Sequence, residues 1–188
     1  MTRIVAGVAR GRRLTVPTKG TRPTADRVRE AVFSALAARI DLDGARVLDL
    51  YAGSGALGLE ALSRGAAHVV LVEADARAAA VARANVAAVG LPGASVRTSR
   101  VASLLAGGTD APFDLVLADP PYAVTEVAVT GVLAALLEHG WVAEDSLVVL
   151  ERAARGPVTT WPDGLEPRWD RSYGEARLEI ASCYGPRP

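Results

Sequence analysis

The sequence predicts an α/β protein built on a doubly wound, mostly parallel sheet. From Arg46 onward, short apolar runs alternate with longer stretches of helical periodicity, which is the pattern of successive βαβ units. The runs Val69–Val72 and Leu147–Leu150 contain no polar residues, as expected for parallel strands that helices cover on both faces. Two further strands flank Gly174-Glu175 and indicate an antiparallel pair that closes one edge of the sheet.

The chain begins with a predicted β-hairpin and helix. Residues 2–16 alternate on both sides of Ala9-Arg10-Gly11, which predicts two short strands, and helical spacing predicts an amphipathic helix over 25–40. Seven sheet strands are expected at residues 46–51, 68–73, 94–98, 113–118, 146–151, 168–173 and 176–184. Helices are expected near residues 56–64, 75–89, 100–106 and 126–139. We therefore divide the chain into an N-terminal basic extension over residues 1–40, which does not fold independently, and a sheet domain over residues 41–188.

The composition is that of one folded domain. The chain has 188 residues, of which 50% are hydrophobic and 22% are charged, and one domain usually takes about 100–200 residues. Its longest apolar runs are far shorter than the roughly 18 residues that span a bilayer, so we expect a cytoplasmic protein with no membrane contact. A single cysteine excludes a disulfide within the chain, and two separated histidines give no basis for a metal site.

Positive charge is concentrated at the beginning of the chain. Residues 1–30 hold eight basic and two acidic groups, a balance of +6, whereas the remaining residues carry a balance of −6. Clustered arginines can neutralise phosphates and release counterions, so the basic extension is a candidate nucleic-acid contact. From charge alone, a solvated hairpin explains the same pattern equally well.

A glycine-rich loop follows the first strand of the predicted sheet and opens a helix. It begins at Asp49, and its glycines Gly53, Gly55 and Gly58 match the G-x-G-x-x-G pattern, while Glu73 ends the next strand, where an acid can bind ribose hydroxyls. The pattern fits NAD and S-adenosylmethionine. An acid just upstream would repel a pyrophosphate but suits the cationic methionine end of S-adenosylmethionine. The methyl donor is therefore favoured, and the dinucleotide stays open.

A second loop, Asp119-Pro120-Pro121-Tyr122, directly follows the predicted strand over residues 113–118. The carboxyl ends of parallel strands share one edge, so this loop is expected in the same crevice as the glycine loop. Methylation of an exocyclic amine requires acceptors that hold the N–H groups and stabilise developing charge, and Asp119 and the Pro120 carbonyl can supply them. The two prolines fix the backbone, and Tyr122 offers a flat face for stacking a base.

These two loops together resemble the class I S-adenosylmethionine-dependent methyltransferases that act on amino nitrogens of nucleic-acid bases. The first loop is similar to their motif I and the second to their [DNS]-P-P-[YF] catalytic loop. The beginning of the chain, with Arg3-Ile4-Val5-Ala6-Gly7, Arg10-Gly11-Arg12-Arg13-Leu14 and Arg22-Pro23-Thr24-Ala25-Asp26-Arg27-Val28-Arg29-Glu30, resembles the RsmD-type enzymes. In that family the product is N2-methylguanine at position 966 of bacterial 16S rRNA. The resemblance covers nearly the whole chain and is weaker from residue 150 onward.

The resemblance implies a fold, a substrate and a set of site residues. The fold would be a seven-stranded Rossmann-like methyltransferase sheet, and the substrate 16S rRNA in a 30S subunit or an assembly intermediate, modified by a monomer. Asp119, Pro120, Pro121 and Tyr122 would be catalytic. S-adenosyl-L-methionine would be bound by Asp49, Tyr51, Ala52, Gly53, Ser54, Gly55, Glu73, Ala74, Ser99, Arg100, Val101 and Asp119. RNA phosphates would be contacted by Arg10, Arg12, Arg13, Arg22 and Arg27.

Three alternatives remain beside this interpretation. A DNA adenine-N6 or cytosine-N4 methyltransferase uses the same loop chemistry, although 188 residues leave little room for a domain that reads a DNA sequence. An NAD-dependent oxidoreductase would leave the Asp119–Tyr122 loop without a role. A non-catalytic RNA-binding assembly factor on a degenerate scaffold would be expected to have lost one of the two loops, and both are intact.

Overall fold

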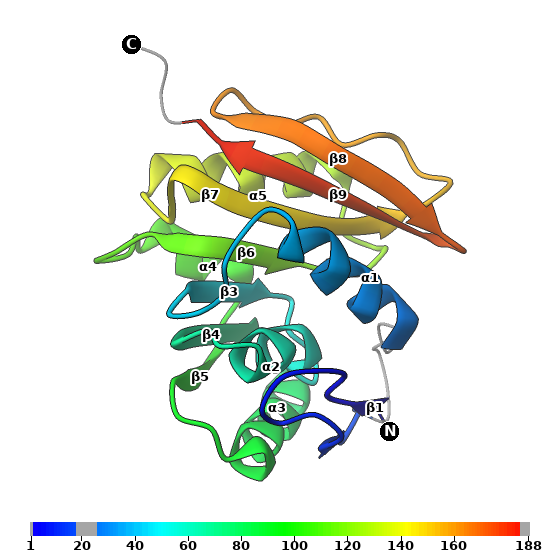
Figure 1. Cartoon of the computed structure of the whole chain (residues 1–188). Helices are drawn as coiled ribbons and strands as arrows, with labels where there is room; N and C mark the ends of the chain where they lie inside the picture. Colours follow the sequence, from blue (N-terminus) through cyan, green and yellow to red (C-terminus); the bar gives the residue numbers. More distant parts are fainter. Residues whose placement is uncertain (1, 18–25, 185–188) are drawn as a thin grey trace.

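The centre of the molecule is one seven-stranded sheet (Figure 1). The computed structural model describes residues 2–17 and 26–184. The sheet strands are β3 (Arg46–Leu50), β4 (His68–Glu73), β5 (Ala94–Thr98), β6 (Phe113–Ala118), β7 (Val142–Ala153), β8 (Leu165–Tyr173) and β9 (Ala176–Cys183). Their order is β5-β4-β3-β6-β7-β9-β8, with parallel pairing from β5 to β7 and with β9 antiparallel to both of its neighbours. The predicted mostly parallel sheet with an antiparallel pair at one edge is confirmed.

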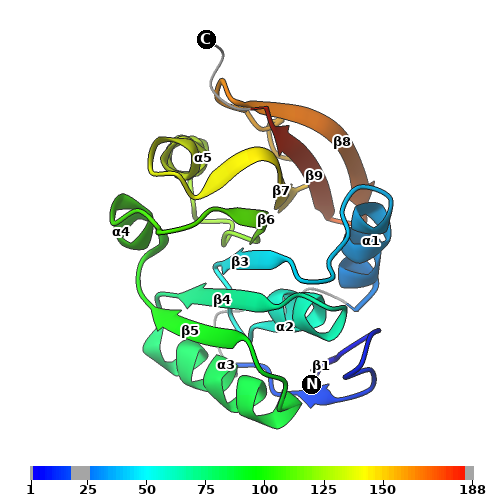
Figure 2. The same cartoon turned by 60° about the vertical axis from the view of Figure 1, so that its left-hand side comes forward.

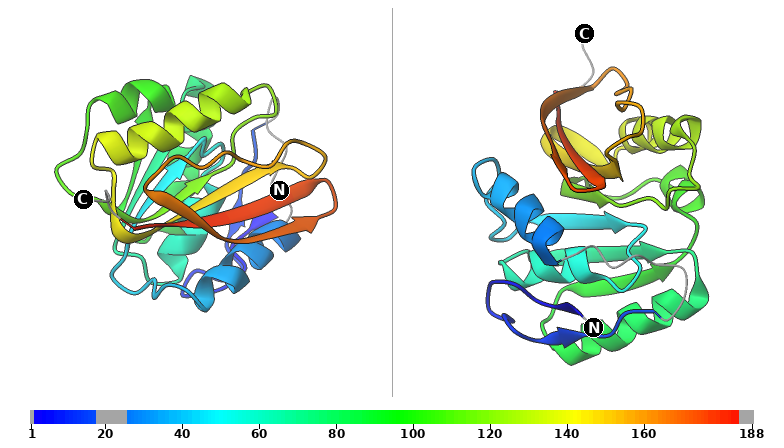
Figure 3. Two further views of the ribbon diagram at one scale, coloured as in Figure 1. Left: turned by 90° about the horizontal axis from the view of Figure 1, so that it is seen from above. Right: turned by 90° about the vertical axis from the view of Figure 1, so that its right-hand side faces the viewer.

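Helices cover the sheet on both faces (Figures 2 and 3). One core cluster joins the sheet to α1 (Asp26–Ala37), α2 (Ala56–Ser63) and α3 (Ala76–Val89). The other core cluster joins the opposite face to α4 (Val101–Ala106) and α5 (Glu126–Glu138). The helix starts follow local chemistry, because the side chains of Asp75 and Thr125 accept hydrogen bonds from backbone N–H groups in the first turns of α3 and α5.

The N-terminal hairpin is short and packs against the sheet domain. Its strands β1 (Thr2–Arg3) and β2 (Arg13–Leu14) pair antiparallel, as predicted, although each is only two residues long. Ile4 and Leu14 are fully buried in the same core cluster as α2. The chain passes so close to α2 that a Cβ on Gly7 would lie 1.8 Å from the Ser63 carbonyl oxygen. The boundary at residue 40 stays a prediction, but the two parts share one hydrophobic core.

A buried ion pair fixes this extension to α2. Arg29 and Glu60 have no exposed side-chain surface, and their Nε and Oε2 atoms are 3.5 Å apart. The Glu60 carboxylate also accepts hydrogen bonds from the backbone N–H groups of Val5 and Ala6, at 2.8 and 2.9 Å. Removing one member of such a pair leaves an uncompensated buried charge, which costs about 3–5 kcal/mol. The extension is therefore held in a fixed position by polar contacts as well as by its apolar residues.

Several element boundaries differ from the sequence-based expectation, among them the start of β8, which lies at Leu165, three residues before the predicted start. Helix α1 ends at Ala37, three residues before the predicted end. Strand β7 begins at Val142, four residues before the predicted start, because Val142 pairs with Phe113 ahead of an irregularity in the register. The polar residues between the paired segments, among them Asp145 with φ of 69°, hid this first part of the strand. Within the described ranges, no helix is both long enough and apolar enough to cross a membrane.

Candidate active site

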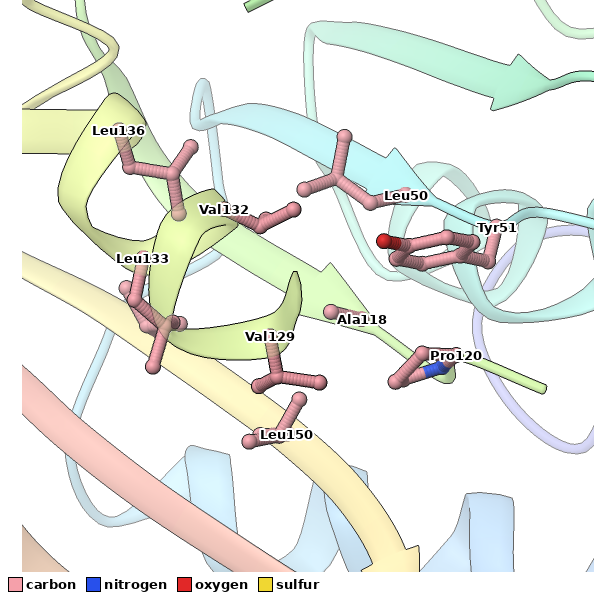
Figure 4. A pocket seen from close by; sticks show the side chains of 10 residues that line it. Leu50, Tyr51, Ala118, Pro120, Val129, Val132, Leu133, Leu136 and Leu150 are labelled. Atoms are coloured by element: carbon pink, nitrogen blue, oxygen red, sulfur yellow. The ribbon is translucent and has the colours of Figure 1, made fainter. Parts of the chain in front are cut away.

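The glycine loop and the Asp119–Tyr122 loop leave the sheet at the same level. Leu50, the last residue of β3, pairs with Val72 on one side and with Ala118, the last residue of β6, on the other. The chain segments that follow therefore meet at the carboxyl edge of three adjacent strands. Figure 4 shows Tyr51 and Pro120 close together above the end of the sheet. The two loops therefore begin side by side at the edge of the sheet where the sequence predicts a crevice.

The backbone of the glycine loop is held in an uncommon conformation. Tyr51, Gly53 and Gly55 have φ values of 60°, 54° and 81°, in the left-handed region that favours glycine. A Cβ on Gly58 would lie 2.3 Å from a methyl carbon of Leu71, so the start of α2 packs flush against β4. Glycine at positions 53, 55 and 58 lets the loop turn sharply and lets α2 begin close to β4.

Asp49 lies behind the glycine loop rather than on its surface. Its side chain is buried, and Oδ2 accepts a 2.8 Å hydrogen bond from the Gly58 N–H. Burial, together with the nearby carboxyls of Asp119 and Glu73, raises the pKa of Asp49 to about 7 against the opposing effect of the Gly58 hydrogen bond. Asp49 thus anchors the loop to α2 and places a titratable group beneath it.

Glu73 joins the glycine loop to the beginning of α3. Its Oε2 accepts a hydrogen bond from the Gly53 N–H at 2.9 Å, and its Oε1 accepts one from the Asp75 N–H at 2.8 Å. Each carboxylate oxygen can accept a further hydrogen bond, and the side chain is only half-buried. These two acceptor oxygens therefore fit a ribose, whose two hydroxyl groups can donate to them. Ala74, the next residue, is exposed beside it.

The segment over residues 99–101 reaches the same edge from β5. The Ser99 N–H donates to the Glu73 carbonyl at 3.0 Å, and the Ser99 hydroxyl donates to the Arg100 carbonyl at 3.1 Å. Arg100 is exposed and Val101 is buried at the start of α4. The three groups of residues predicted to bind a cofactor thus follow three adjacent strands, in the sheet order β5, β4 and β3.

The catalytic loop predicted from the sequence has a buried half and an exposed half. Pro120 is buried and lines a narrow apolar recess with Leu50, Tyr51 and Ala118 below the loop and with side chains of α5 opposite (Figure 4). Beyond it, Pro121 and Tyr122 are exposed, with Tyr122 exposing 61% of its surface. The loop is therefore fixed at its base while the tyrosine ring faces outward.

One residue at this edge, Glu151, was not singled out from the sequence. It follows Leu150, which pairs with Ala118, so it lies beside Asp119. Burial, and to a smaller extent the carboxyl of Asp119, raises the pKa of Glu151 to about 8. A signal was present in the sequence, because an apolar run ends in an acid on β7 just as it does on β6.

The predicted RNA-binding arginines have different surroundings. Arg10, Arg13 and Arg27 are exposed. The Arg12 guanidinium instead donates to backbone carbonyl groups at the end of α3, including that of Ala88 at 3.2 Å. Arg22 lies outside the described residues. Arg12 is exposed like these three, but it also has a structural contact.

Asn85 connects the N-terminal extension to the glycine loop. Its side chain is buried; Nδ2 donates to the carbonyl groups of Thr15 and Ser54, each at 2.9 Å, and Oδ1 accepts from the Thr15 N–H at 2.8 Å. Sequence analysis did not identify this residue, since a lone asparagine in an alanine-rich helix carries no pattern. The contact means that the extension and the glycine loop share one fixed support.

Comparison with known proteins identifies the family of this chain. Residues 2–182 match the family model described as Conserved hypothetical protein 95. The chain belongs to this family. Ribosomal RNA small subunit methyltransferase D of Escherichia coli is 42% identical over 180 residues, which cover 95% of this chain and 88% of that protein. The protein of the same name from Haemophilus influenzae is 35% identical over 164 residues, covering 84% and 82%. The resemblance to RsmD-type enzymes is therefore confirmed.

Solved structures of the family's members have the same fold. A candidate methyltransferase of Escherichia coli is 33% identical with a TM-score of 0.87, covering 98% of both chains. A Thermus thermophilus protein is 35% identical with a TM-score of 0.81, covering 97% of this chain and 99% of that one. Magnesium protoporphyrin IX methyltransferase of Synechocystis, with bound S-adenosylmethionine, is 16% identical with a TM-score of 0.67, covers 88% and 86%, and shows the shared fold alone. The fold is a Rossmann-like methyltransferase fold.

Proposed function

We propose that this chain transfers a methyl group from S-adenosyl-L-methionine to the exocyclic N2 amine of a guanine in 16S rRNA, at position 966 in conventional rRNA numbering. The observation that carries the proposal is the meeting of the glycine loop with the Asp119–Tyr122 loop at one edge of the sheet. The names of the two relatives, both small-subunit rRNA methyltransferases, support the choice of substrate.

The cofactor is S-adenosyl-L-methionine, and the residues at the edge of β3, β4 and β5 fit it. Residues 53–55 of the glycine loop would border the methionine portion, Glu73 would accept from the ribose hydroxyls, and residues 99–101 would border the adenine. When bound, S-adenosyl-L-methionine supplies a methyl group activated by a sulfonium charge. Asp49, which the loop covers, supplies a compensating negative potential.

The catalytic loop holds the amine of the base. The Asp119 carboxylate and the Pro120 carbonyl accept its two N–H groups, which aims the nitrogen lone pair and stabilises positive charge on nitrogen. The exposed Tyr122 ring stacks on the base, a contact that contributes about 1–3 kcal/mol in other systems. The nitrogen loses its extra proton to water, so no histidine or cysteine is needed. A target guanine must leave its stack to reach this loop, which favours a loop nucleotide.

The proposed substrate form is a 30S subunit or an assembly intermediate, bound in the cytoplasm by a monomer. A single small domain with a short basic extension has few contacts with which to select one guanine. The exposed Arg10, Arg13 and Arg27 supply general attraction to phosphate. Folded rRNA in a particle would supply the remaining selectivity by presenting one accessible base.

The test is transfer of labelled methyl from S-adenosyl-L-methionine to 30S particles from a strain that lacks the modification. We expect N2-methylguanosine at one small-subunit position, identified by mass spectrometry of the digested rRNA. If S-adenosyl-L-methionine binds but neither 30S particles nor free 16S rRNA accepts methyl, the substrate is another nucleic acid. If S-adenosyl-L-methionine does not bind, the dinucleotide interpretation returns.

A further inference from the structure

The strand order separates the cofactor side of the crevice from the base side. The glycine loop follows β3, Glu73 ends β4, and both lie on one side of β6. Strand β7 lies on the other side of β6. Because Asp119 follows β6 and holds the reacting amine in the proposed function, a base whose amine points to the cofactor extends over the end of β7. The residue at that end is placed to contact the base.

Glu151 is the residue of β7 that lies beside Asp119. Ala118 pairs with Leu150, so Asp119 and Glu151 are the next residues on neighbouring strands. Leu117 and Val149, two positions earlier, belong to the same core cluster, so strand alternation places both acids on that face of the sheet. Neighbouring strands are about 4.8 Å apart. The two carboxyl groups are therefore side by side.

The bonding of Glu151 is incomplete. Its Oε2 atom is buried and has no hydrogen-bond partner among residues 2–17 and 26–184, which the structure describes. Buried polar atoms in folded proteins nearly always have a partner, so an unpartnered one is expected to acquire it from a ligand or water. With a pKa raised to about 8 by burial and then by Asp119, the carboxyl is mostly neutral at pH 7 and offers one acceptor and one donor.

We propose that Glu151 recognises the target guanine by hydrogen bonds to N1–H and O6, next to the amine that Asp119 holds. This inference rests on the proposed function. The Watson–Crick edge of guanine presents its 2-amine, N1–H and O6 in that order. Because Asp119 holds the 2-amine, N1–H and O6 lie toward β7. A neutral carboxyl accepts from N1–H and donates to O6. Adenine has no N1–H and no O6, so Glu151 is a specificity-determining residue.

The test compares two bases at the target position. The substrates are 30S particles reconstituted with 16S rRNA that carries guanine or 2-aminopurine, which keeps the 2-amine but lacks both N1–H and O6. We expect the wild-type enzyme to prefer guanine by about 10- to 100-fold in kcat/KM, the usual range for a bidentate base contact. Glu151→Ala should lose most of this preference. It should react more slowly than the wild type with guanine and about as fast as the wild type with 2-aminopurine. Glu151→Gln, which keeps one donor and one acceptor, should retain most of it.

Control variants separate recognition from folding. Glu166→Ala removes an exposed glutamate of β8 and should leave the preference unchanged. Glu151→Met keeps the length of the side chain without its hydrogen bonds, and it replaces the alanine variant if that variant does not fold. Each variant should bind S-adenosyl-L-methionine with wild-type affinity.

An equal loss of kcat/KM with guanine and with 2-aminopurine in Glu151→Ala would overturn the inference and leave the proposed function standing. Failure of the wild-type enzyme to methylate guanine-containing particles would overturn the proposed function, and the inference with it.

Discussion

The carboxyl groups on the cofactor side of the crevice and on the base side differ in how completely they are hydrogen-bonded. On the cofactor side, Asp49 accepts from the Gly58 N–H, and both oxygens of Glu73 accept from backbone N–H groups. On the base side, Oε2 of Glu151 is buried without a hydrogen-bond partner in the part of the chain that the structure describes. The chain thus completes the hydrogen bonds of its own cofactor loop and leaves one carboxyl oxygen unpartnered where a base would bind.

The difference shows which part of the site is preorganised. A loop that is fixed before binding loses little entropy when its ligand arrives. The glycine loop is fixed twice, by Glu73 at Gly53 and by Asn85 at the Ser54 carbonyl. The base side instead combines an exposed Tyr122 with an incompletely bonded Glu151. Binding of the cofactor should therefore require little rearrangement, whereas the base completes its own site.

The largest expected effect is that of Asp119→Ala. Removing the group that holds the amine should lower the rate of methyl transfer by at least about 1000-fold, the scale of losing a preorganised charge-stabilising contact. The dissociation constant of S-adenosyl-L-methionine should change by less than about threefold, because the cofactor side keeps its hydrogen bonds. Single-turnover transfer and calorimetric titration measure the two effects separately. A variant that keeps most of its activity would show that Asp119 is not catalytic.

The next effect should fall on the other side of the crevice. Glu73→Ala removes the expected ribose contact and two backbone contacts of the glycine loop, so S-adenosyl-L-methionine should bind about 10- to 100-fold more weakly. Affinity for 30S particles, measured without cofactor, should not change. Asp75→Ala is the matched control, since it removes only the cap of α3 and should lower stability by about 1 kcal/mol. Equal weakening by both variants would mean that Glu73 acts only through the fold.

The parts of the site that the sequence predicted are those encoded by local pattern. The glycine loop and the Asp119–Tyr122 loop each have a composition that few other structures explain, and the strand ends bring them together. The pattern of apolar runs also predicted the strands well, because a buried parallel strand needs apolar residues on both faces. The first part of β7 was missed, since its polar residues after Val142 resemble a loop.

Contacts between distant segments could not be predicted in the same way. Glu151 becomes a candidate only once the pairing of Ala118 with Leu150 is known. Asn85 and Arg12 acquire their contacts from the position of the hairpin on α2 and α3, and no local pattern specifies that position. Type and spacing in the sequence therefore propose candidate site residues, whereas residues whose contacts come from register or packing become candidates only in the structure.

The pH dependence of binding should distinguish S-adenosyl-L-methionine, which carries a sulfonium charge, from its product, which has lost that charge. The pKa of Asp49 is raised to about 7, so its carboxyl is mostly protonated below that pH and ionised above it. A sulfonium cation favours the ionised form, so S-adenosyl-L-methionine should bind up to about tenfold more tightly as the pH rises from 6 to 8, with release of a proton. S-adenosylhomocysteine, which has no sulfonium charge, should show much less change. Asp49→Asn should remove the difference, and an unchanged difference in that variant would assign it to another group.

The same ionisation should be visible in stability. A carboxyl with a higher pKa in the folded than in the unfolded state binds more protons when folded, so its contribution favours folding at low pH. For Asp49 this contribution is lost as the pH rises from about 4 to about 7. Urea unfolding of the wild type should therefore give a free energy of unfolding that declines more steeply across this range than that of Asp49→Asn. A parallel pair of curves would contradict the raised pKa.

The smallest effects should come from the basic extension, and they test which side of the crevice it serves. Arg10→Ala and Arg13→Ala remove exposed charges, so each should lower affinity for 30S particles and reduce the slope of log affinity against log salt by about 0.7–0.9. Arg12→Ala should additionally lower Tm by about 2–4 °C, because its guanidinium bonds carbonyl groups at the end of α3. None of the three should alter the affinity for S-adenosyl-L-methionine. If Arg10→Ala or Arg13→Ala weakened cofactor binding, the extension would act through Asn85 on the glycine loop, and the two sides of the crevice would be coupled rather than separate.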